Sequence, residues 1–344
     1  MSEKNKTTVV LTTINPPNPK IGKWAEVSGN KVIVVGDNKT PSDWNHKDCD
    51  FISIGTQKEG DFEISKCLLE NHYTRKNIGY LYALENNASM IIDTDDDNFP
   101  YLEKWSELMA YEKETLYLED QGELTYKNVY THFSNSSIPF WPRGFPLNKL
   151  ALENSVITPN EVVPSKGYNA IGLLQCMVDG DPDIDAIHRL IFKKTPTFVH
   201  KDPIIFGKNN LCSFNSQNTL WMRKSIFPLL YLPATVSFRF TDILRSYVAQ
   251  IILDRAEISF GFYPPTSYQE RNDHNLMADF ESETSMYQRT EEIVSTLDGA
   301  VSQNVSIGDN LVNAYSSLEK IDVVDPLELQ LIDYWLTDIA KFIP

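Results

Sequence analysis

Four aspartates follow a short apolar run in the segment MIIDTDDDNF, residues 90–99. They are Asp93, Asp95, Asp96 and Asp97, and like charges this close together repel one another and raise the cost of folding. A divalent cation would relieve that repulsion, because Mg²⁺ and Mn²⁺ take carboxylate and phosphate oxygens as ligands. Acids at a strand end can thus hold an ion that also binds a diphosphate and neutralises it as a leaving group. A solvated turn with capping aspartates is the alternative that the segment alone leaves open.

Two other uses of clustered aspartates fit poorly. A calcium-binding EF-hand loop that began at Asp93 would need Gly at its sixth position and Glu at its twelfth, where this chain has Asn98 and Lys104. A phosphatase-type aspartyl nucleophile usually follows the first strand and has Thr or Val where this chain has Asp97.

The elements around the aspartates indicate a parallel sheet. Apolar, β-branched segments at 8–14, 31–37, 51–55 and 89–93 predict strands, and the apolar positions in 75–88 have helical spacing. Continuous apolar strands joined by helices are typical of a parallel sheet that is buried on both faces. Ligands of such sheets bind outside the carboxyl ends of the strands, where Asp37 and Asp93 both lie.

Cations lie close to these acids in the sequence. Arg75 and Lys76 stand at the start of the predicted helix, where positive side chains oppose the helix dipole unless an anion binds there. The segment GDNKTPSDW after the second strand supplies Asp37 for a ribose hydroxyl or base edge and Lys39 for a phosphate. Each feature alone also has a simpler explanation. Arg75 and Lys76 could point into solvent, and the segment GDNKTPSDW could be an ordinary turn.

The rest of the chain divides into a mixed region and a helical one. Residues 130–265 alternate short strands with proline-containing loops and two predicted helices, whereas the part after about residue 276 has little Pro or Gly and is amphipathic. We therefore expect one domain over residues 1–277 and a helical C-terminal extension over 278–344.

Composition excludes several classes of protein. The 344 residues are 42% hydrophobic and 23% charged, with a formal net charge of −16, which disfavours binding to nucleic acid or to anionic membranes. The four cysteines lack CxxC spacing, and no apolar run approaches the ~20 residues of a membrane span. We expect a soluble, cytoplasmic protein with reduced thiols and no integral membrane segment.

Seven motifs together resemble one family. They are GDNKTPSDW, YTRKNIGYLYALENNASMIIDTDDDN, WPRGFPLNKL, GLLQCMVDGDPDIDAIHRL, NSQNTLW, YLPATVSFRFTDILRSYVAQ and QERNDHN. The likeness runs from about residue 8 to residue 277. The chain resembles the STELLO-type glycosyltransferases and, more distantly, the reversibly glycosylated polypeptides that act as UDP-arabinopyranose mutases. Each motif alone is weak, and the combination is specific.

The resemblance implies an α/β protein with the GT-A glycosyltransferase fold, a mostly parallel Rossmann-like sheet flanked by helices. It implies Mn²⁺ or Mg²⁺, a UDP-, GDP- or CMP-sugar donor, and a glycan or other hydroxyl acceptor, as in polysaccharide biosynthesis. The implied function is metal-dependent glycosyl transfer. The alternatives are a nucleotide-sugar mutase or self-glycosylating protein, and a non-catalytic nucleotide-sugar binder. The chain could also form a homodimer, which the sequence does not decide.

Roles follow residue by residue from the resemblance. Asp242, at the start of a predicted helix, is the expected base that deprotonates the acceptor, and Asp183 is expected to bind sugar hydroxyls. Arg143 matches the arginine that takes the sugar in the mutases, and it is otherwise a donor-binding cation. Helix capping is the alternative for Asp242, and either Asp183 or Asp185 is expected to cap a helix. The metal ligands implied are Asp95, Asp97 and His274, and the donor-binding residues are Asp37, Lys39, Arg75, Lys76, Asn77, Asp95, Asp96 and Arg271.

Overall fold

The computed structural model describes residues 6–343 except 112, 121, 166–170 and 272–274. Its described strands are β1 (Thr7–Thr12), β2 (Val32–Val35), β3 (Cys49–Ile52), β4 (Met90–Thr94), β5 (Asn98–Pro100), β6 (Leu116–Leu118), β7 (Thr125–Tyr126), β8 (Val162–Pro164), β9 (Ile171–Asp179), β10 (Ile204–Phe206), β11 (Asn210–Leu211), β12 (Asn218–Trp221) and β13 (Ser259–Gln269). Its described α-helices are α1 (Lys23–Ser28), α2 (Ile54–Glu59), α3 (Lys76–Glu85), α4 (Leu102–Met109), α5 (Val129–Phe133), α6 (Ala186–Ile191), α7 (Thr241–Arg255), α8 (Leu276–Ala300), α9 (Ile307–Glu319) and α10 (Leu327–Ile339).

One large sheet runs through the molecule in the order β3-β2-β1-β4-β12-β9-β13-β10-β6-β8, and β5 pairs with β13. β1, β2, β3 and β4 are parallel, β12 is antiparallel to both of its neighbours, and β13 is parallel to β9. The predicted α/β class with a mostly parallel central sheet is therefore confirmed, and it agrees with a GT-A-like fold. The four predicted strands correspond to β1, β2, β3 and β4.

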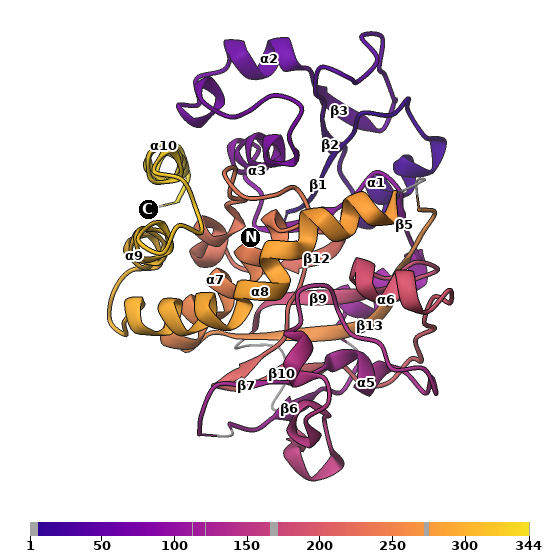
Figure 1. Cartoon of the computed structure of the whole chain (residues 1–344). Coiled ribbons are helices and arrows are strands. Elements are labelled where there is room, and N and C mark those ends of the chain that lie inside the picture. The colour runs from indigo at the N-terminus through magenta and orange to yellow at the C-terminus, as the bar shows by residue number, and fades with distance from the viewer. Residues whose placement is uncertain (1–5, 112, 121, 166–170, 272–274, 344) are drawn as a thin grey trace, which may run out of the picture.

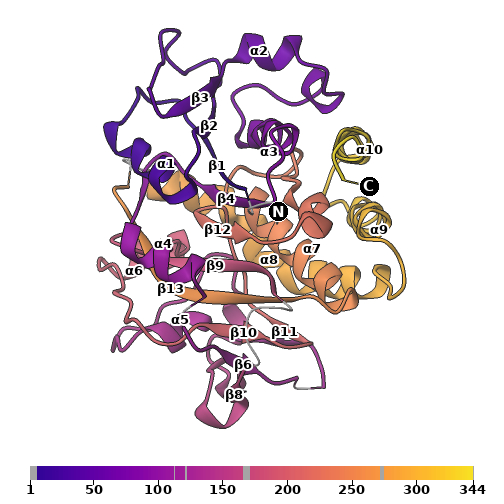
Figure 2. The same cartoon turned by 180° about the vertical axis from the view of Figure 1, so that it is seen from behind.

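Both faces of the sheet are buried, as the continuous apolar strands predict. In β1, Val9 and Leu11 pack in one hydrophobic cluster while Val10 packs in the other, because successive side chains of a strand point to opposite faces. Helices α1 and α4 cover one face through Trp24 and Trp105, and α3 and α7 cover the other (Figures 1 and 2). This packing fixes the strand ends, where the predicted site lies.

The C-terminal part is helical, as expected, and α8, α9 and α10 pack against the rest of the chain instead of standing apart from it (Figure 1). Glu328 of α10 is fully buried and accepts hydrogen bonds from the backbone N–H groups of Ala234 and Thr235. Asp338 of the same helix is also fully buried and accepts from the N–H groups of Glu63 and Ile64 at 2.9 Å each. α10 thereby joins two loops that lie far apart in the sequence.

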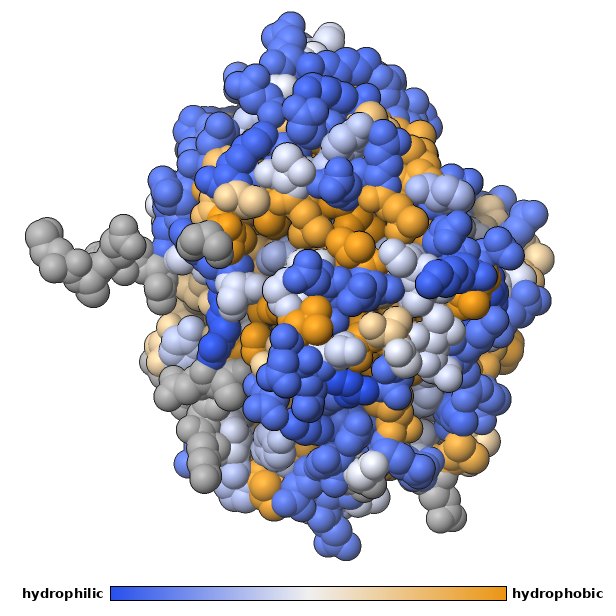
Figure 3. All heavy atoms as spheres, turned by 90° about the vertical axis from the view of Figure 1, so that its left-hand side faces the viewer, coloured by the Kyte–Doolittle hydropathy of each residue, from blue (hydrophilic) through white to orange (hydrophobic). Residues whose placement is uncertain are grey.

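The surface on the side of α9 and α10 is mostly hydrophilic and carries a band of hydrophobic side chains (Figure 3). Val312 of α9 is among the exposed apolar side chains. No helix among the described residues is long and apolar enough to span a membrane. The four cysteines are unpaired.

Candidate active site

A cavity of about 690 Å³ lies at the carboxyl ends of β1, β2 and β4. Its wall combines the end of β1, the end of β2 and the acidic turn after β4 with residues from the second half of the chain. The predicted site residues that line it are Asp37, Lys39, Arg75, Asp95, Asp96, Asp97, Arg143, Asp183, Asp242 and Arg271. Residues that lie up to 234 positions apart in the sequence, from Asp37 to Arg271, therefore face one space.

The first two acids of the triplet already have protein partners. Asp95 Oδ1 accepts hydrogen bonds from the Tyr73 hydroxyl at 2.6 Å and from Lys76 Nζ at 3.2 Å. Asp96 Oδ2 accepts from the Thr13 hydroxyl at 2.5 Å. Burial raises the pKa of Asp95, and the charge of Lys76 opposes that rise. Asp95 and Asp96 are thus held by different parts of the wall.

Asp97, unlike Asp95, has neutral hydrogen-bond donors among the described residues, as Asp96 also has in Thr13 and Asn15. Its carboxylate accepts from the side-chain amides of Gln269 at 2.9 Å and Asn98 at 3.2 Å. Burial and the neighbouring charges of Asp95 and Asp96 raise the pKa of Asp97 to about 7. A carboxyl group without a cationic partner among the described residues, beside two like charges, has the electrostatic environment in which a divalent cation binds favourably.

The described residues fit a cation held by few protein ligands. Among them, no three His, Cys, Asp or Glu side chains converge on one point. Mg²⁺ typically takes one or two carboxylates and completes its shell with water and substrate phosphates, so Asp97 and the second oxygen of Asp95 would be the protein ligands of a cation bound here. His274, the third predicted ligand, lies outside the described residues.

Lys76 lies beneath the acidic turn and does not line the cavity. Its Nζ is 2.6 Å from Asp93 and 3.2 Å from Asp95, and the side chains of Lys76 and Asp93 are fully buried. Arg245 contacts the other oxygen of Asp93 at 2.8 Å. Asp93 is therefore a buried anion between two cations. Lys76, predicted to contact the donor directly, instead neutralises the acids under the site.

Arg75 begins α3 as predicted, and its guanidinium points into the protein. Nε donates to the Gln57 side chain at 2.6 Å and Nη1 to the Leu68 carbonyl at 3.2 Å. Nη2 is buried and has no protein hydrogen-bond partner among the described residues, although Arg75 lines the cavity. A buried donor without an acceptor is costly, so this nitrogen favours an acceptor atom from a ligand.

Asp37 lines the cavity and holds a neighbouring loop in place. Its two carboxylate oxygens accept from the backbone N–H groups of Asn71 at 2.9 Å and His72 at 3.0 Å. The residue thereby ties the loop before α3 to the end of β2. Lys39 lines the cavity and is exposed, which leaves its ammonium group accessible to a ligand.

Asn77 is a predicted donor-binding residue that lies away from the cavity. It is fully buried, and its side-chain amide makes two hydrogen bonds of 2.9 Å with the backbone of Leu232. This paired amide joins α3 to the loop before α7. Helical geometry explains why Asn77 does not reach the cavity. Successive residues of a helix point in different directions, so the side chain of Asn77 points away from the strand ends.

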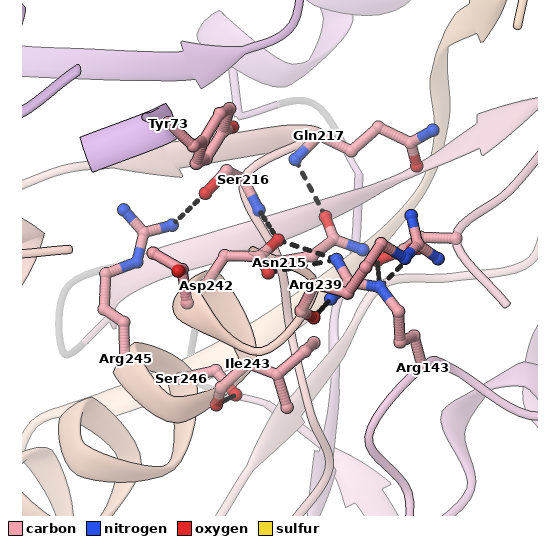
Figure 4. Close-up of polar contacts among 12 residues, drawn as sticks. Tyr73, Arg143, Asn215, Ser216, Gln217, Arg239, Asp242, Ile243, Arg245 and Ser246 are labelled. Carbon is pink, nitrogen blue, oxygen red and sulfur yellow. Dashed lines mark hydrogen bonds and ion pairs between the residues drawn. The ribbon is translucent and has the colours of Figure 1, made fainter. Parts of the chain in front are cut away.

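The predicted catalytic residues form one network (Figure 4). Arg143 Nε donates to Asp183 at 2.8 Å, and Nη2 donates to both oxygens of Asp242 at 3.0 and 2.9 Å. Nη1 donates to the Arg239 carbonyl, and the Ser216 N–H donates to Asp242 at 3.2 Å. Every nitrogen of the guanidinium is thus committed to a protein acceptor.

The charge of Arg143 decides the state of Asp183. Burial favours the neutral acid, yet the charge and hydrogen bonds of Arg143 outweigh burial and hold the pKa of Asp183 below its ordinary value. Asp183 is therefore an anion at neutral pH. Asp185, two residues on, caps α6 by accepting from the His188 N–H at 3.0 Å, which resolves the predicted capping alternative between the two acids.

Two arginines on the wall are held by acids of other segments. Arg239 Nε donates to Glu283 of α8 at 2.8 Å, and Arg271 lies 3.5 Å from Asp181 and 3.4 Å from Asp279 of α8. Sequence reasoning selected Arg271 and missed Arg239. A signal was available, because the motif FRFTDILRSY contains Arg239 three residues before the selected Asp242.

Sequence reasoning also missed neutral and aromatic residues of the wall. Gln217, Gln269, Tyr73 and Phe238 all line the cavity, and Phe238 is 56% exposed. Each falls within a motif that carries the family resemblance. Neutral amides and aromatic rings occur throughout proteins, however, and their spacing alone does not indicate a site.

Sequence comparisons agree with the resemblance. The model of the family described as STELLO glycosyltransferases matches residues 239–343. Two relatives from Arabidopsis thaliana are "Probable glycosyltransferase STELLO2", 28% identical over 76% of this chain and 35% of that protein, and "Probable glycosyltransferase STELLO1", 25% identical over 96% of this chain and 44% of that protein. The chain spans less than half the length of these curated relatives.

The family match extends the resemblance that the motifs indicate. The motifs end near residue 277, whereas the matched region runs from Arg239 through α7, β13 and the C-terminal helices. A structure titled "Crystal Structure of a Mycobacterial Protein" aligns with a TM-score of 0.40 and 9% identity over 83% of this chain and 72% of that chain, a likeness too low to bear on function. The family match and the two relatives show that this chain is similar to the STELLO-type glycosyltransferases.

Proposed function

We propose that this chain transfers a sugar from a nucleotide-sugar donor to a hydroxyl acceptor with the help of a divalent cation. One observation carries the proposal: the acidic turn after β4 and the Arg143–Asp242 pair face the same cavity at the strand ends. The first group suits a cation and a diphosphate, and the second suits the handling of hydroxyl groups. Their joint presence is what a transfer between two substrates requires.

The donor would lie along the wall formed by β1, β2 and the start of α3. Positive charge for its phosphates would come from Lys39, Arg75 and Arg271. The Nη2 nitrogen of Arg75, which has no protein acceptor among the described residues, would donate a hydrogen bond to the donor. Asp97 and Asp95 would hold the cation, which when bound neutralises the charge that develops on the departing diphosphate. Asp96 is held at the end of β1 and borders the same space.

The acceptor would bind where Asp183 and Asp242 face the cavity. In the reaction, the acceptor oxygen forms a bond to the anomeric carbon while the bond from that carbon to the diphosphate oxygen breaks. The diphosphate leaves with the electron pair, and Asp242 receives the hydroxyl proton. This description applies to a transfer with inversion at the anomeric carbon.

Arg143 bears on the mutase alternative. A sugar attached to this arginine would need a guanidinium nitrogen that is free to attack, whereas all three nitrogens donate to protein acceptors. The side chain is also 6% exposed. These contacts favour a positioning role for Arg143, which keeps Asp183 and Asp242 in place as charged acceptors of hydroxyl hydrogen bonds.

A thermal-shift panel of UDP-, GDP- and CMP-sugars, each with and without Mn²⁺, tests the proposal. A ligand that binds the folded chain raises its melting temperature by mass action, so at least one donor should raise it in a manner that depends on Mn²⁺. Asp97→Asn should abolish that dependence, and Asp333→Asn, an exposed position on α10, should not. A donor that binds but is neither hydrolysed nor transferred would leave the non-catalytic alternative, and no shift with any donor would refute the proposal.

A further inference from the structure

The motif NSQNTLW, residues 215–221, carries the family resemblance without any assigned role. Its second half is β12, which pairs with β4 in an antiparallel register that sets Asn218 opposite Thr94. Its first half, residues 215–217, is the turn that enters this strand. The turn is buried and lies beside the acidic turn after β4, with Gln217 at 7% exposure.

A chain of side-chain amides runs from this turn to Asp97. Gln217 Nε2 donates to Gln269 Oε1 at 2.8 Å, and Gln269 Nε2 donates to Asp97 Oδ2 at 2.9 Å. Gln217 Nε2 also donates to the Asp181 carbonyl at 3.3 Å. At one end, the Asp181 carbonyl can only accept hydrogen bonds, and at the other end so can Asp97 in the ionised form that would hold a cation.

Acceptors at both ends fix the direction of both glutamines. A glutamine amide has one end that donates and one that accepts, so the nitrogen of Gln269 that donates to Asp97 leaves its oxygen directed toward Gln217. Gln217 must then donate from its side-chain nitrogen to the Gln269 oxygen. The second hydrogen of that nitrogen is donated to the Asp181 carbonyl. Without that donor, Gln269 could turn over and direct its oxygen at the Asp97 carboxylate, which would repel it.

The same turn also contacts the acids on the other side of the cavity (Figure 4). The Ser216 N–H donates to Asp242 at 3.2 Å, and the Ser216 hydroxyl accepts from Arg245, which pairs with the buried Asp93. Gln217 is therefore anchored by neighbours that are themselves fixed within the sheet and α7. An anchored donor can orient Gln269, which is only half-buried.

We propose that Gln217 is a positioning residue for the divalent cation, which orients the Asp97 carboxylate through the amide of Gln269. The inference rests on the proposed function in one respect, because it takes Asp97 as a cation ligand. Partners that hold metal ligands in place commonly change metal affinity by about 10–100-fold when they are removed. Gln217 would act without contact to the cation.

Titration of the full chain with Mn²⁺ alone, followed by calorimetry or by the electron paramagnetic resonance signal of free Mn²⁺, tests this role. Gln217→Met should weaken Mn²⁺ binding by about 10-fold, and Gln269→Met should do so at least equally. Since Gln217 acts through Gln269, the double variant should bind Mn²⁺ within about two-fold of Gln269→Met alone. Gln330→Met, an exposed glutamine on α10, is the matched control and should bind as the unmodified chain does.

The outcomes separate the inference from the proposed function. If the unmodified chain binds Mn²⁺ and Gln217→Met binds equally well, or if the two glutamine effects simply add, the positioning role is wrong and the proposed function stands. If the unmodified chain does not bind Mn²⁺, both the cation site and the role of Gln217 are wrong. Melting curves establish that each variant folds, and Gln217→Asn, which keeps the amide but shortens its reach, replaces Gln217→Met if the latter does not fold.

Discussion

Arg143 and Asp242 are joined through a single nitrogen, because Nη2 of the arginine contacts both carboxylate oxygens at 3.0 and 2.9 Å. This geometry neutralises the carboxylate while it leaves further lone pairs on each oxygen. A carboxylate has about four acceptor positions, so an incoming hydroxyl can still hydrogen-bond to Asp242. The arginine thus holds the carboxylate in place and leaves it able to meet a substrate.

Replacement of Asp242 by asparagine tests its role as the base. The Asp242→Asn variant would keep the size of the side chain but could not take the acceptor's proton, so the rate of sugar transfer should fall by about 10²–10⁴-fold. Donor binding, measured as the Mn²⁺-dependent rise in melting temperature, should persist because Asp242 faces the acceptor. Asp333→Asn serves as the exposed control. The predicted capping alternative is wrong, because the N-cap of α7 is Phe240 without a side-chain hydrogen bond. A rate within a few-fold of the unmodified chain would therefore show that Asp242 is not the base.

Removal of Arg143 should destabilise the fold. Arg143→Met would leave the buried carboxylates of Asp183 and Asp242 without a cation, a change that typically costs about 3–5 kcal/mol in the free energy of unfolding. Urea denaturation monitored by tryptophan fluorescence measures this loss. Lys66→Met, which removes an exposed ion pair with Glu63, should leave the unfolding midpoint unchanged.

Arg143 also provides a test of self-glycosylation. Radiolabelled donor sugar should not stay covalently bound to the unmodified chain after denaturation, because the Arg143 nitrogens are all engaged. Stable label that disappears in Arg143→Lys would instead support the mutase alternative.

Asp185 should make stability depend on pH. Burial, with smaller effects from the charges of Glu283 and Asp183, raises the pKa of Asp185 to about 7, although the Trp141 indole and the His188 N–H donate to it. An acid with a raised pKa in the folded state stabilises the fold fully below its unfolded value of about 3.9 and loses that contribution as the pH rises through about 7.

Asp185→Asn removes the titration and keeps an oxygen that can cap α6. The free energy of unfolding of the variant, minus that of the unmodified chain, should therefore increase by roughly 4 kcal/mol between pH 4 and pH 7.5 and stay constant above it. Urea unfolding at four pH values across this window measures the difference. A difference that stays flat, or falls as the pH rises, would contradict the assignment.

Glu328 should be essential for the attachment of α10. Its carboxylate accepts from the N–H groups of Ala234 and Thr235 and from the Tyr231 hydroxyl, all in the loop before α7. Glu328→Ala would leave several buried donors without acceptors, at a cost of about 3 kcal/mol or more in the free energy of unfolding. Glu281→Ala, at an exposed position of α8, is the control and should be nearly neutral. An equal effect of both substitutions would argue against the buried contacts.

Much of the central sheet could be predicted from the sequence because its signals are local. The apolar run that ends at Asp93 is a strand, and the acids that follow it line a cavity, since a buried parallel sheet leaves its ligands only the strand ends. The helix that starts near Arg75 also appears where its apolar spacing indicates it.

The partners of individual side chains could not be predicted in this way. Lys76 and Asn77 follow Arg75 directly in the sequence, yet both are buried beneath the cavity wall, because helical rotation and contacts with Asp93 and Leu232 decide their direction. Gln217 and Gln269 meet across 52 residues of sequence. Such contacts depend on the assembled sheet, and no local pattern records them.

The buried acids of α10 have a consequence for the order in which the chain can fold during synthesis. Asp338 accepts from the amides of Glu63 and Ile64, which precede it by 275 and 274 positions in the sequence. The strands β1, β2 and β3 therefore leave the ribosome long before the helix that satisfies the backbone of the loop beside them. Until α10 emerges, those amides must remain hydrated, so the loop at Glu63 and Ile64 reaches its native hydrogen bonding only after α10 has been synthesised.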